Sequence, residues 1–202
     1  MKIYDSQSAP NPRRVRIFLA EKGIKVPYEE VDIVKAVNRS PEFRKKNPLG
    51  TLPVLELDDG TCISESVAIC RYFEEIHPEP PLMGTDARDR ALVEMWQRCM
   101  EFEIFIPIAQ VFRNAHAFFK GRIPQVPEWG EVCRKQSEHQ LQWLDEVLAD
   151  REFIAGARYT IADITALCGV DFGRVSGIRI QPEQKNLARW HAAVSSRPSA
   201  KA

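Results

Sequence analysis

The stretch from Asn47 to Ser66 constrains the fold of this chain more than any other segment, because it joins a proline, a hairpin turn and a polar helix start. Pro53 stands at the front of an apolar run, although proline cannot donate a hydrogen bond to a neighbouring strand. It is therefore expected at the first residue of a strand or on a sheet edge. Asp58-Asp59-Gly60 predicts a hairpin turn, and residues 61–63 are expected to form the returning strand.

A helix is predicted to begin directly after this strand. Ile69, Phe73 and Ile76 recur at helical spacing, and Glu65 and Ser66 precede them. The N-terminus of a helix carries partial positive charge and open N–H groups, which attract anions. A carboxylate and a hydroxyl at this position suit a small zwitterionic ligand.

The peptide bond before Pro53 decides what the preceding residue can bind. If the Leu52–Pro53 bond is cis, the N–H and C=O of Leu52 turn away from the sheet and stay free. Free backbone groups of this kind pair with the extended backbone of a ligand. We therefore expect Leu52 and the helix start to form one binding site.

The first half of the chain carries further strand and helix signals. The expected elements are a strand over residues 2–5, a helix with Pro12 at its first position and ended by Gly23, a strand over 26–33, and a short helix over 41–46 capped by Ser40. Two parallel strands joined by a crossover helix, followed by a hairpin and a helix, match the thioredoxin-like arrangement.

A different architecture is expected after the proline-rich segment from His77 to Gly84, where only helical spacing is found. The first expected helix runs from Asp86 toward Phe119, with a kink at Pro107 and an apolar stripe of Leu92, Met95, Cys99, Phe102 and Ile106. A second helix is expected to carry Trp129, Cys133, Trp143, Leu144 and Val147. A third is expected to carry Ile164, Leu167 and Cys168, and a last one Leu187, Trp190 and Val194.

The start of the third of these helices fits a capping box formed by Thr160 and Asp163, which gives Asp163 a structural role. The predicted fold class is an α+β thioredoxin-like domain followed by an all-α helical domain. The predicted boundaries are 1–77 for the first domain, 78–85 for a linker and 86–202 for the second domain.

The composition is that of an ordinary soluble globular protein, with 44% hydrophobic and 28% charged residues. The formal net charge is zero, which does not favour nucleic acid or an acidic membrane surface as a partner. Neither an export signal nor a membrane-spanning run is recognised, so a cytoplasmic location is expected. The five cysteines lack a C-x-x-C pair and the four histidines lack zinc spacing, which favours reduced structural thiols and no metal.

The order of these signals resembles the cytosolic glutathione transferase family, in particular bacterial, theta- and nu-like members. In that family a proline after a short loop precedes the third strand, and a Glu-Ser or Asp-Ser pair starts the third helix. The run FIAGARYTIADI and the ending RPSAKA are similar to the helical domain of the family. The resemblance covers nearly the whole chain and implies the glutathione transferase fold, glutathione as co-substrate, a role in detoxification and a homodimer.

The resemblance also assigns residues to glutathione. Glu65 and Ser66 match the pair that holds the γ-glutamyl amine and carboxylate. Leu52 matches the residue whose backbone pairs with the cysteinyl unit, in a geometry set by Pro53.

Two further positions depart from the family pattern. Thr51 and Asn38 fall where the family often places glutamine, lysine or histidine for the cysteinyl or glycyl end. Both are expected to bind glutathione, although neither supplies the usual basic side chain.

The catalytic task implied by the resemblance is to hold glutathione as a thiolate, since the thiolate is the nucleophile and a free cysteine thiol titrates near about 8.5. Serine- and cysteine-class members place a donor or a thiol where this chain has Ala9. No cysteine precedes Cys62, which excludes a mixed-disulfide mechanism at that position.

The residues beside Ala9 are therefore the catalytic candidates. Asn11 is favoured, because its side-chain amide can donate near the positive end of the first helix and Pro10-Asn11 resembles the nu-class pattern, which uses an asparagine. Asparagine is also common as an ordinary turn or helix-start residue, so Asn11 could have either a catalytic or a structural role. Ser8 is the second candidate and Ser6 the third, while Tyr4 is expected to pack in the first strand.

Two functions from different classes follow from this sequence. The first is an enzyme that uses the glutathione thiolate to attack a small hydrophobic electrophile or to reduce a disulfide or peroxide. The residues expected to edge its second-substrate site are Phe102, Ile106, Phe112, Arg113 and His116. The alternative is a non-catalytic binding or scaffold protein of the same fold, which Ala9 makes credible.

Overall fold

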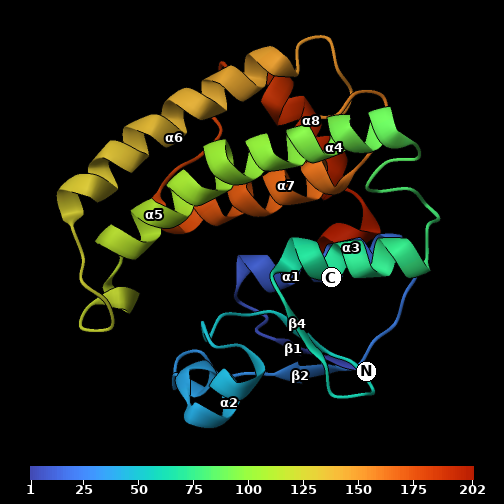
Figure 1. The fold of residues 1–202 in the computed structure, drawn as a ribbon. Coiled ribbons are helices and arrows are strands. Elements are labelled where there is room, and N and C mark those ends of the chain that lie inside the picture. The colour runs from blue at the N-terminus through green and yellow to red at the C-terminus, as the bar shows by residue number, and fades with distance from the viewer. The chain divides into compact units, whose positions relative to one another are not determined.

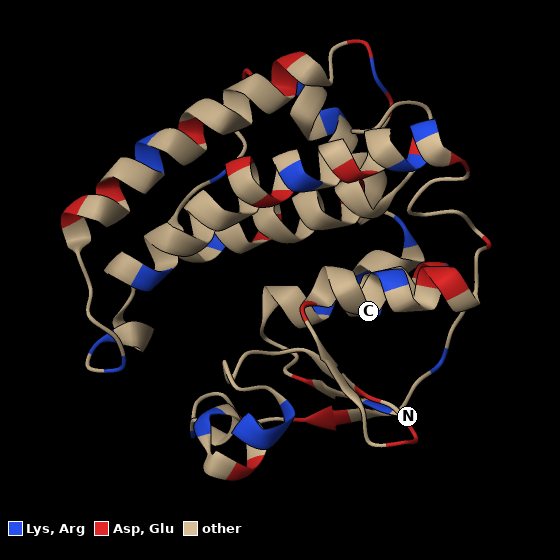
Figure 2. Cartoon of the chain, in the orientation of Figure 1, with Lys and Arg blue, Asp and Glu red and all other residues tan.

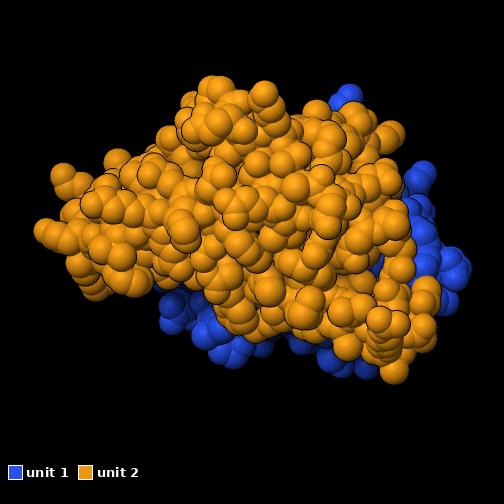
Figure 3. Space-filling view, turned by 90° about the horizontal axis from the view of Figure 1, so that it is seen from above, with its two compact units in different colours: residues 1–82, 201–202 blue, residues 83–200 orange.

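The computed structural model describes all of residues 1–202 (Figure 1). The chain divides into two compact units, residues 1–82 with 201–202 and residues 83–200, which Figure 3 colours separately. The predicted linker over 78–85 stays a prediction. Each unit is described by itself below.

Unit 1 contains a four-stranded sheet in the order β2-β1-β3-β4. The strands are β1 (Lys2–Asp5), β2 (Tyr28–Glu30), β3 (Val54–Glu56) and β4 (Cys62–Ser64). β1 pairs in parallel with β2 and antiparallel with β3, which pairs antiparallel with β4. This mixed sheet confirms the predicted thioredoxin-like arrangement.

Three helices cover this sheet: α1 (Pro10–Glu21), α2 (Pro41–Lys46) and α3 (Ser66–Ile76). α1 and α3 pack against each other on one side of the sheet, and α2 lies on the opposite side (Figure 1). Neighbouring strand residues face opposite sides of a sheet. Accordingly Tyr4 and its cross-strand neighbour Val54 join Phe43 of α2 in one buried cluster.

Two boundaries in unit 1 differ from the predictions. α1 begins at Pro10 instead of Pro12, because both prolines fit a first helical turn, where an N–H would lack an intrahelical acceptor. The second strand covers only Tyr28–Glu30 instead of residues 26–33, since the chain beyond it turns at Asp32. The Asp32 Oδ1 accepts the N–H groups of Val34 and Lys35, both at 2.9 Å.

Other local predictions are confirmed. Gly23 has a φ of +66°, as a left-handed end of α1 requires. Ser40 Oγ accepts the N–H of Phe43 and caps α2. The hairpin turn carries Gly60 at a φ of +86°.

Unit 2 contains helices and no named strand. Its main helices are α4 (Ala87–Cys99), α5 (Ile106–Ala115), α6 (Pro127–Val147), α7 (Ile161–Gly173) and α8 (Lys185–Ser195). Every residue from 161 to 170 is buried, which makes α7 the central helix of the unit. Gly169 lets α7 approach the backbone of Phe105 closely, because a Cβ at position 169 would lie 3.2 Å from the Cα of Phe105. Basic and acidic residues are interspersed along the outer helices (Figure 2).

The long helix from Asp86 differs from its prediction in two ways. A π-helical segment, Met100–Phe105, separates α4 from α5, and the helix ends at Ala115 instead of continuing toward Phe119. Pro107 lacks an N–H, so the regular hydrogen-bond ladder cannot pass through it, and the segment widens just before it. The predicted apolar stripe is mostly exposed; its exposed members are Leu92, Met95, Phe102 and Ile106.

The predicted capping box at the start of α7 is confirmed. The Thr160 side chain caps the helix, while the Asp163 carboxylate accepts the N–H of Thr160 at 3.0 Å. Asp163 also accepts the N–H of Ile154 at 3.0 Å and the indole N–H of Trp190 at 2.8 Å. Asp163 therefore joins three segments of unit 2, as its structural role predicted.

No helix is both long and apolar enough to cross a membrane. No group of three or more His, Cys, Asp or Glu side chains is arranged to hold a metal ion.

Candidate active site

The loop before β3 presents free backbone groups. The Leu52–Pro53 bond is cis. The N–H and C=O of Leu52 make no hydrogen bond within the protein, and the first residue of β3 is Val54. Leu52 is therefore open to an extended ligand, as the sequence predicted for a cis bond.

The side chain of Asn47 holds this loop in place. Its Nδ2 donates to both the carbonyl oxygen and the Oγ1 of Thr51 at 2.9 Å, and its Oδ1 accepts the N–H of Leu49 at 3.1 Å. Asn47 is buried, so these bonds are shielded from water. The Thr51 hydroxyl thus serves the loop itself, and its predicted contact with glutathione stays a prediction.

Asn38 has a similar role from the other side of the loop. Its Nδ2 donates to the carbonyl oxygen of Gly50 at 2.6 Å. Gly50 has a φ of +63°, and a Cβ there would lie only 2.6 Å from the Asn38 carbonyl oxygen. The loop therefore requires glycine at position 50, and Asn38 stabilises it. Binding of glutathione by Asn38 stays a prediction.

The start of α3 has open N–H groups, as an anion site requires, and a strained residue before them. Ser66 is the first helical residue, and its N–H and the next two lie ahead of the first intrahelical bond, from Ile69 N–H to Glu65 C=O. Glu65 is exposed and has a φ of +69°, a conformation that costs of the order of 1–3 kcal/mol for a residue other than glycine. Such strain is typical of functional sites.

Arg14 is a candidate site residue that sequence reasoning missed. Its Nη1 donates to Ser66 Oγ at 2.7 Å, and only 1% of Arg14 and 4% of Ser66 are exposed. Because Ser66 Oγ accepts this bond, its own proton is available for a ligand. The signal in the sequence was the position of Arg14 four residues before Phe18, on the buried face of α1.

The start of α1 offers few donors, and Asn11 supplies them. Pro10 and Pro12 have no N–H, and the N–H of Arg13 donates to the Ala9 carbonyl at 3.3 Å. In this turn only Asn11 therefore has a free backbone N–H. Its half-buried side-chain amide makes no hydrogen bond within the protein either.

Ser8, Ser6 and Tyr4 are the other residues near the start of α1 that could donate a hydrogen bond to the sulfur of glutathione. The Ser8 side chain is exposed and makes no hydrogen bond within the protein, while Ser6 is buried. Tyr4 packs in β1 as predicted, with its hydroxyl donating to Glu56 at 2.7 Å. Its ring meets Phe43 edge to face at 5.7 Å.

The protein's own thiols are buried or half-buried, and their structural role stays a prediction. All five cysteines are free of disulfides. Burial raises the pKa of the Cys62, Cys99 and Cys133 thiols above the ordinary value, which keeps these thiols protonated at neutral pH.

The residues expected at the second-substrate site fall into two groups within unit 2. Phe112 packs with His116 at 4.6 Å and with Phe172 at 5.0 Å between ring centroids. Phe118 and Phe119 complete this aromatic cluster, and Arg113 lies 5.2 Å from the Phe119 ring. Phe102 and Ile106 lie on the exposed stripe of the long helix instead.

Together, these features define a class of protein: a thioredoxin-like unit with an open binding loop, followed by an all-helical unit. Family models for the glutathione S-transferase N-terminal domain and C-terminal domain match residues 3–81 and 128–198. "Glutathione S-transferase 2" of Saccharomyces cerevisiae is 35% identical over 100% of this chain and 88% of its own length. The chain therefore belongs to the glutathione S-transferase family.

Solved structures agree with this assignment. A glutathione S-transferase domain-containing protein of Marinobacter aquaeolei VT8 has a TM-score of 0.95 and 39% identity, with 98% of this chain and 99% of that chain covered. Gtt2 of Saccharomyces cerevisiae also has a TM-score of 0.95, with 35% identity and coverage of 100% and 99%. The chain is thus an enzyme of the glutathione S-transferase class, whose co-substrate is glutathione.

Proposed function

We propose that this enzyme binds glutathione along unit 1 and uses its thiolate on a hydrophobic electrophile, or to reduce a disulfide or peroxide. The observation that carries the proposal is the buried Arg14–Ser66 hydrogen bond at the start of α3. It joins a fixed positive charge, a hydroxyl donor and open helix amides, which is what a carboxylate ligand requires.

Glutathione matches this arrangement of charges and backbone groups. Its γ-glutamyl carboxylate would accept from Ser66 and the α3 amides, near the charge of Arg14. The Glu65 carboxylate would meet the ammonium group, and the free backbone of Leu52 would pair with the cysteinyl unit. Each charged end of the ligand would then have a partner.

Asn11 is the proposed activator of sulfur. Its backbone N–H and its side-chain amide both lie in the first turn of α1, whose dipole favours negative charge. Donors aimed at a thiolate lower its pKa and so raise the ionised fraction at neutral pH. Ser8 remains the second candidate, through its exposed hydroxyl.

The second substrate is proposed to be small and hydrophobic. The aromatic cluster around Phe112 supports this choice, because ring faces and edges bind apolar and aromatic groups well. Such substrates fit a role in detoxification. The five free cysteines fit a cytoplasmic location, where thiols are kept reduced.

A homodimer is proposed from the exposed apolar stripe of the long helix. Phe102 is 47% exposed, and Leu92, Met95 and Ile106 are exposed with it. Exposed apolar groups gathered on one helix face are typical of protein interfaces. A second copy of the chain is the occupant that the family resemblance implies.

The ultraviolet difference spectrum of bound glutathione tests this proposal. A thiolate absorbance at pH 7 is expected, because the site is proposed to ionise the sulfur. Binding without thiolate absorbance would favour the non-catalytic alternative. Parallel turnover assays with an aromatic electrophile and with a glutathione mixed disulfide separate conjugation from reduction.

A further inference from the structure

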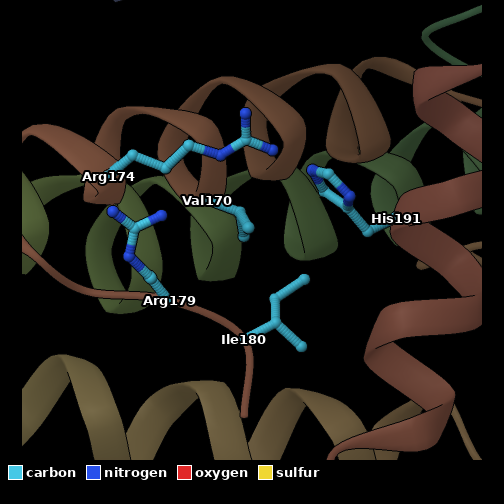
Figure 4. A pocket seen from close by; sticks show the side chains of 5 residues that line it. All are labelled: Val170, Arg174, Arg179, Ile180 and His191. Atoms are coloured by element: carbon cyan, nitrogen blue, oxygen red, sulfur yellow. The ribbon is translucent and has the colours of Figure 1, made fainter. Parts of the chain in front are cut away.

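A pocket lies within unit 2, apart from every residue assigned to glutathione. Its volume is about 310 Å³, and it is lined by Val170, Arg174, Arg179, Ile180 and His191 (Figure 4). These side chains come from the end of α7, the turn that follows it, and α8. No part of the proposed function uses this pocket, so an inference about it stands independently.

The turn after α7 brings two arginines to the same pocket. A short 3₁₀-helix, Arg174–Ser176, ends at Gly177, whose φ is +75°. The N–H of Ile178 then donates to the carbonyl of Gly173 at 2.9 Å. A Cβ at position 173 would lie 3.0 Å from the Ile178 carbonyl oxygen, so this tight return favours glycine.

The returning chain is held by hydrogen bonds on both sides of the turn. Arg134 of α6 donates from Nη1 to the carbonyl of Ser176 at 2.7 Å. Gln181 donates from Nε2 to the carbonyl of Arg179 at 2.9 Å, and Ile178 is buried. The two pocket arginines therefore extend from a preorganised segment. In Figure 4 Arg179 lies at one end of the pocket, and the Arg174 guanidinium extends over Val170 toward His191.

The charges around this pocket leave a positive excess. The Asp171 carboxylate bonds His191 Nε2 at 2.8 Å and lies 3.4 Å from Arg174 Nη2. Arg179 forms no ion pair. Two guanidinium groups thus stand against one carboxylate, even when His191 is neutral. Like charges held together favour the binding of an anion.

Apolar side chains complete the lining. Val170 is buried and Ile180 is half-buried, and Figure 4 shows Val170 next to the Arg174 guanidinium. The pocket is at the small end of the range for ligand sites, which are largely apolar with a few polar groups that fix orientation. A wholly polar anion would leave this apolar part of the lining unused.

We propose that this pocket binds a small amphipathic carboxylate. Its carboxylate group pairs with Arg179 and Arg174, for which the planar guanidinium is well suited, and its apolar body packs against Val170 and Ile180. Asp171 orients Arg174 and His191 without cancelling the charge of Arg179.

The same groups do not form a hydrolytic site. Ser195 Oγ lies 3.5 Å from Nδ1 and 3.4 Å from Nε2 of His191, so it is directed at neither nitrogen. A nucleophile and its base require a short, directed hydrogen bond. The arrangement therefore supports binding and not bond cleavage.

Calorimetric titration of the whole protein with 1-naphthoate tests this proposal, with saturating S-hexylglutathione present to occupy the glutathione site. One naphthoate per chain is expected. Neutral 1-naphthamide, of nearly the same shape, should bind about tenfold more weakly or worse, because it lacks the charge. No naphthoate binding at millimolar concentration in the presence of S-hexylglutathione would overturn the proposal.

Matched variants locate the site. Arg179→Gln should weaken naphthoate binding about tenfold or more, while the exposed Lys185→Gln on α8 should leave it unchanged. Arg174→Gln should also weaken naphthoate binding, as an independent check on the site. Circular dichroism melting checks that each variant is folded. Native affinity in both arginine variants would contradict the assignment.

Discussion

Arg14 and Ser66, 52 positions apart in the chain, form a 2.7 Å hydrogen bond between two buried side chains. The bond ties α1 to the first residue of α3. A buried guanidinium next to open helix amides is arranged for a negative group. We therefore propose that this pair positions the carboxylate of glutathione.

Arg14→Gln should weaken glutathione binding by roughly tenfold to a hundredfold, because a charge-assisted contribution of about 1.5–3 kcal/mol is lost. Isothermal titration measures the change in dissociation constant. Arg44→Gln, on the exposed side of α2, is the control and should bind normally. Equal affinities for both variants would remove Arg14 from the site.

Ser66→Ala and Glu65→Ala should each weaken glutathione binding, since each removes one hydrogen-bond or charge partner from one end of the ligand. The expected loss is again about 1.5–3 kcal/mol per variant. Retention on a glutathione column gives a first comparison, and titration gives the magnitude. Unchanged retention of both variants would show that glutathione binds elsewhere.

Phe102→Glu should disrupt a homodimer, because it places a charge in the exposed apolar stripe. Analytical ultracentrifugation at micromolar concentration should show the native protein at twice the chain mass of 23.1 kDa and the variant near that mass. Val132→Glu, an exposed apolar position on α6, is the control. A native species of single-chain mass would contradict the dimer.

Asp163 should make the free energy of unfolding depend on pH. Burial raises the pKa of its carboxyl group to about 6, against the opposing effect of its hydrogen bonds. Between about pH 4 and 6 the folded chain then binds more protons than the unfolded chain. The contribution of Asp163 to stability therefore falls as pH rises through this window.

Asp163→Asn removes this titration. Urea unfolding at pH 4.5 and at pH 6.5 should show that the stability difference between native protein and variant shrinks at the higher pH. The variant should also be less stable at both, since an amide cannot accept all the bonds from Thr160, Ile154 and Trp190. A difference that is independent of pH would indicate an unshifted carboxyl group.

Local sequence signals predicted much of this fold. Pro53, Gly23, Ser40 and the Thr160–Asp163 pair each act through their own backbone or near neighbours, so their effects were visible in the sequence. The relation between Glu65 and the start of α3 was predicted in the same way. These features set the order of elements and the position of the open loop.

Features that depend on tertiary packing could not be predicted. The burial of Arg14 becomes clear only when α1 is placed against α3. The exposed stripe with Phe102 has the same spacing as a buried one, and spacing alone does not say which face of a helix meets the core. The loop bonds of Asn38 and Thr51 depend on Gly50 and Asn47, which local patterns did not connect.

Asn11→Ala should separate binding from chemistry. Turnover at neutral pH should fall, while glutathione affinity should stay nearly unchanged, because Ser66 and Glu65 still hold the ligand. Ser8→Ala is the matched control and should have little effect. A larger loss in Ser8→Ala than in Asn11→Ala would transfer the donor role to Ser8.

The thiol pKa of bound glutathione tests the central claim most directly, measured as thiolate absorbance against pH in the complex. We predict a pKa well below the value of about 8.5 of a free cysteine thiol in the native protein, and a higher value in Asn11→Ala. A native complex that titrates like free glutathione would contradict activation of the thiol by this enzyme.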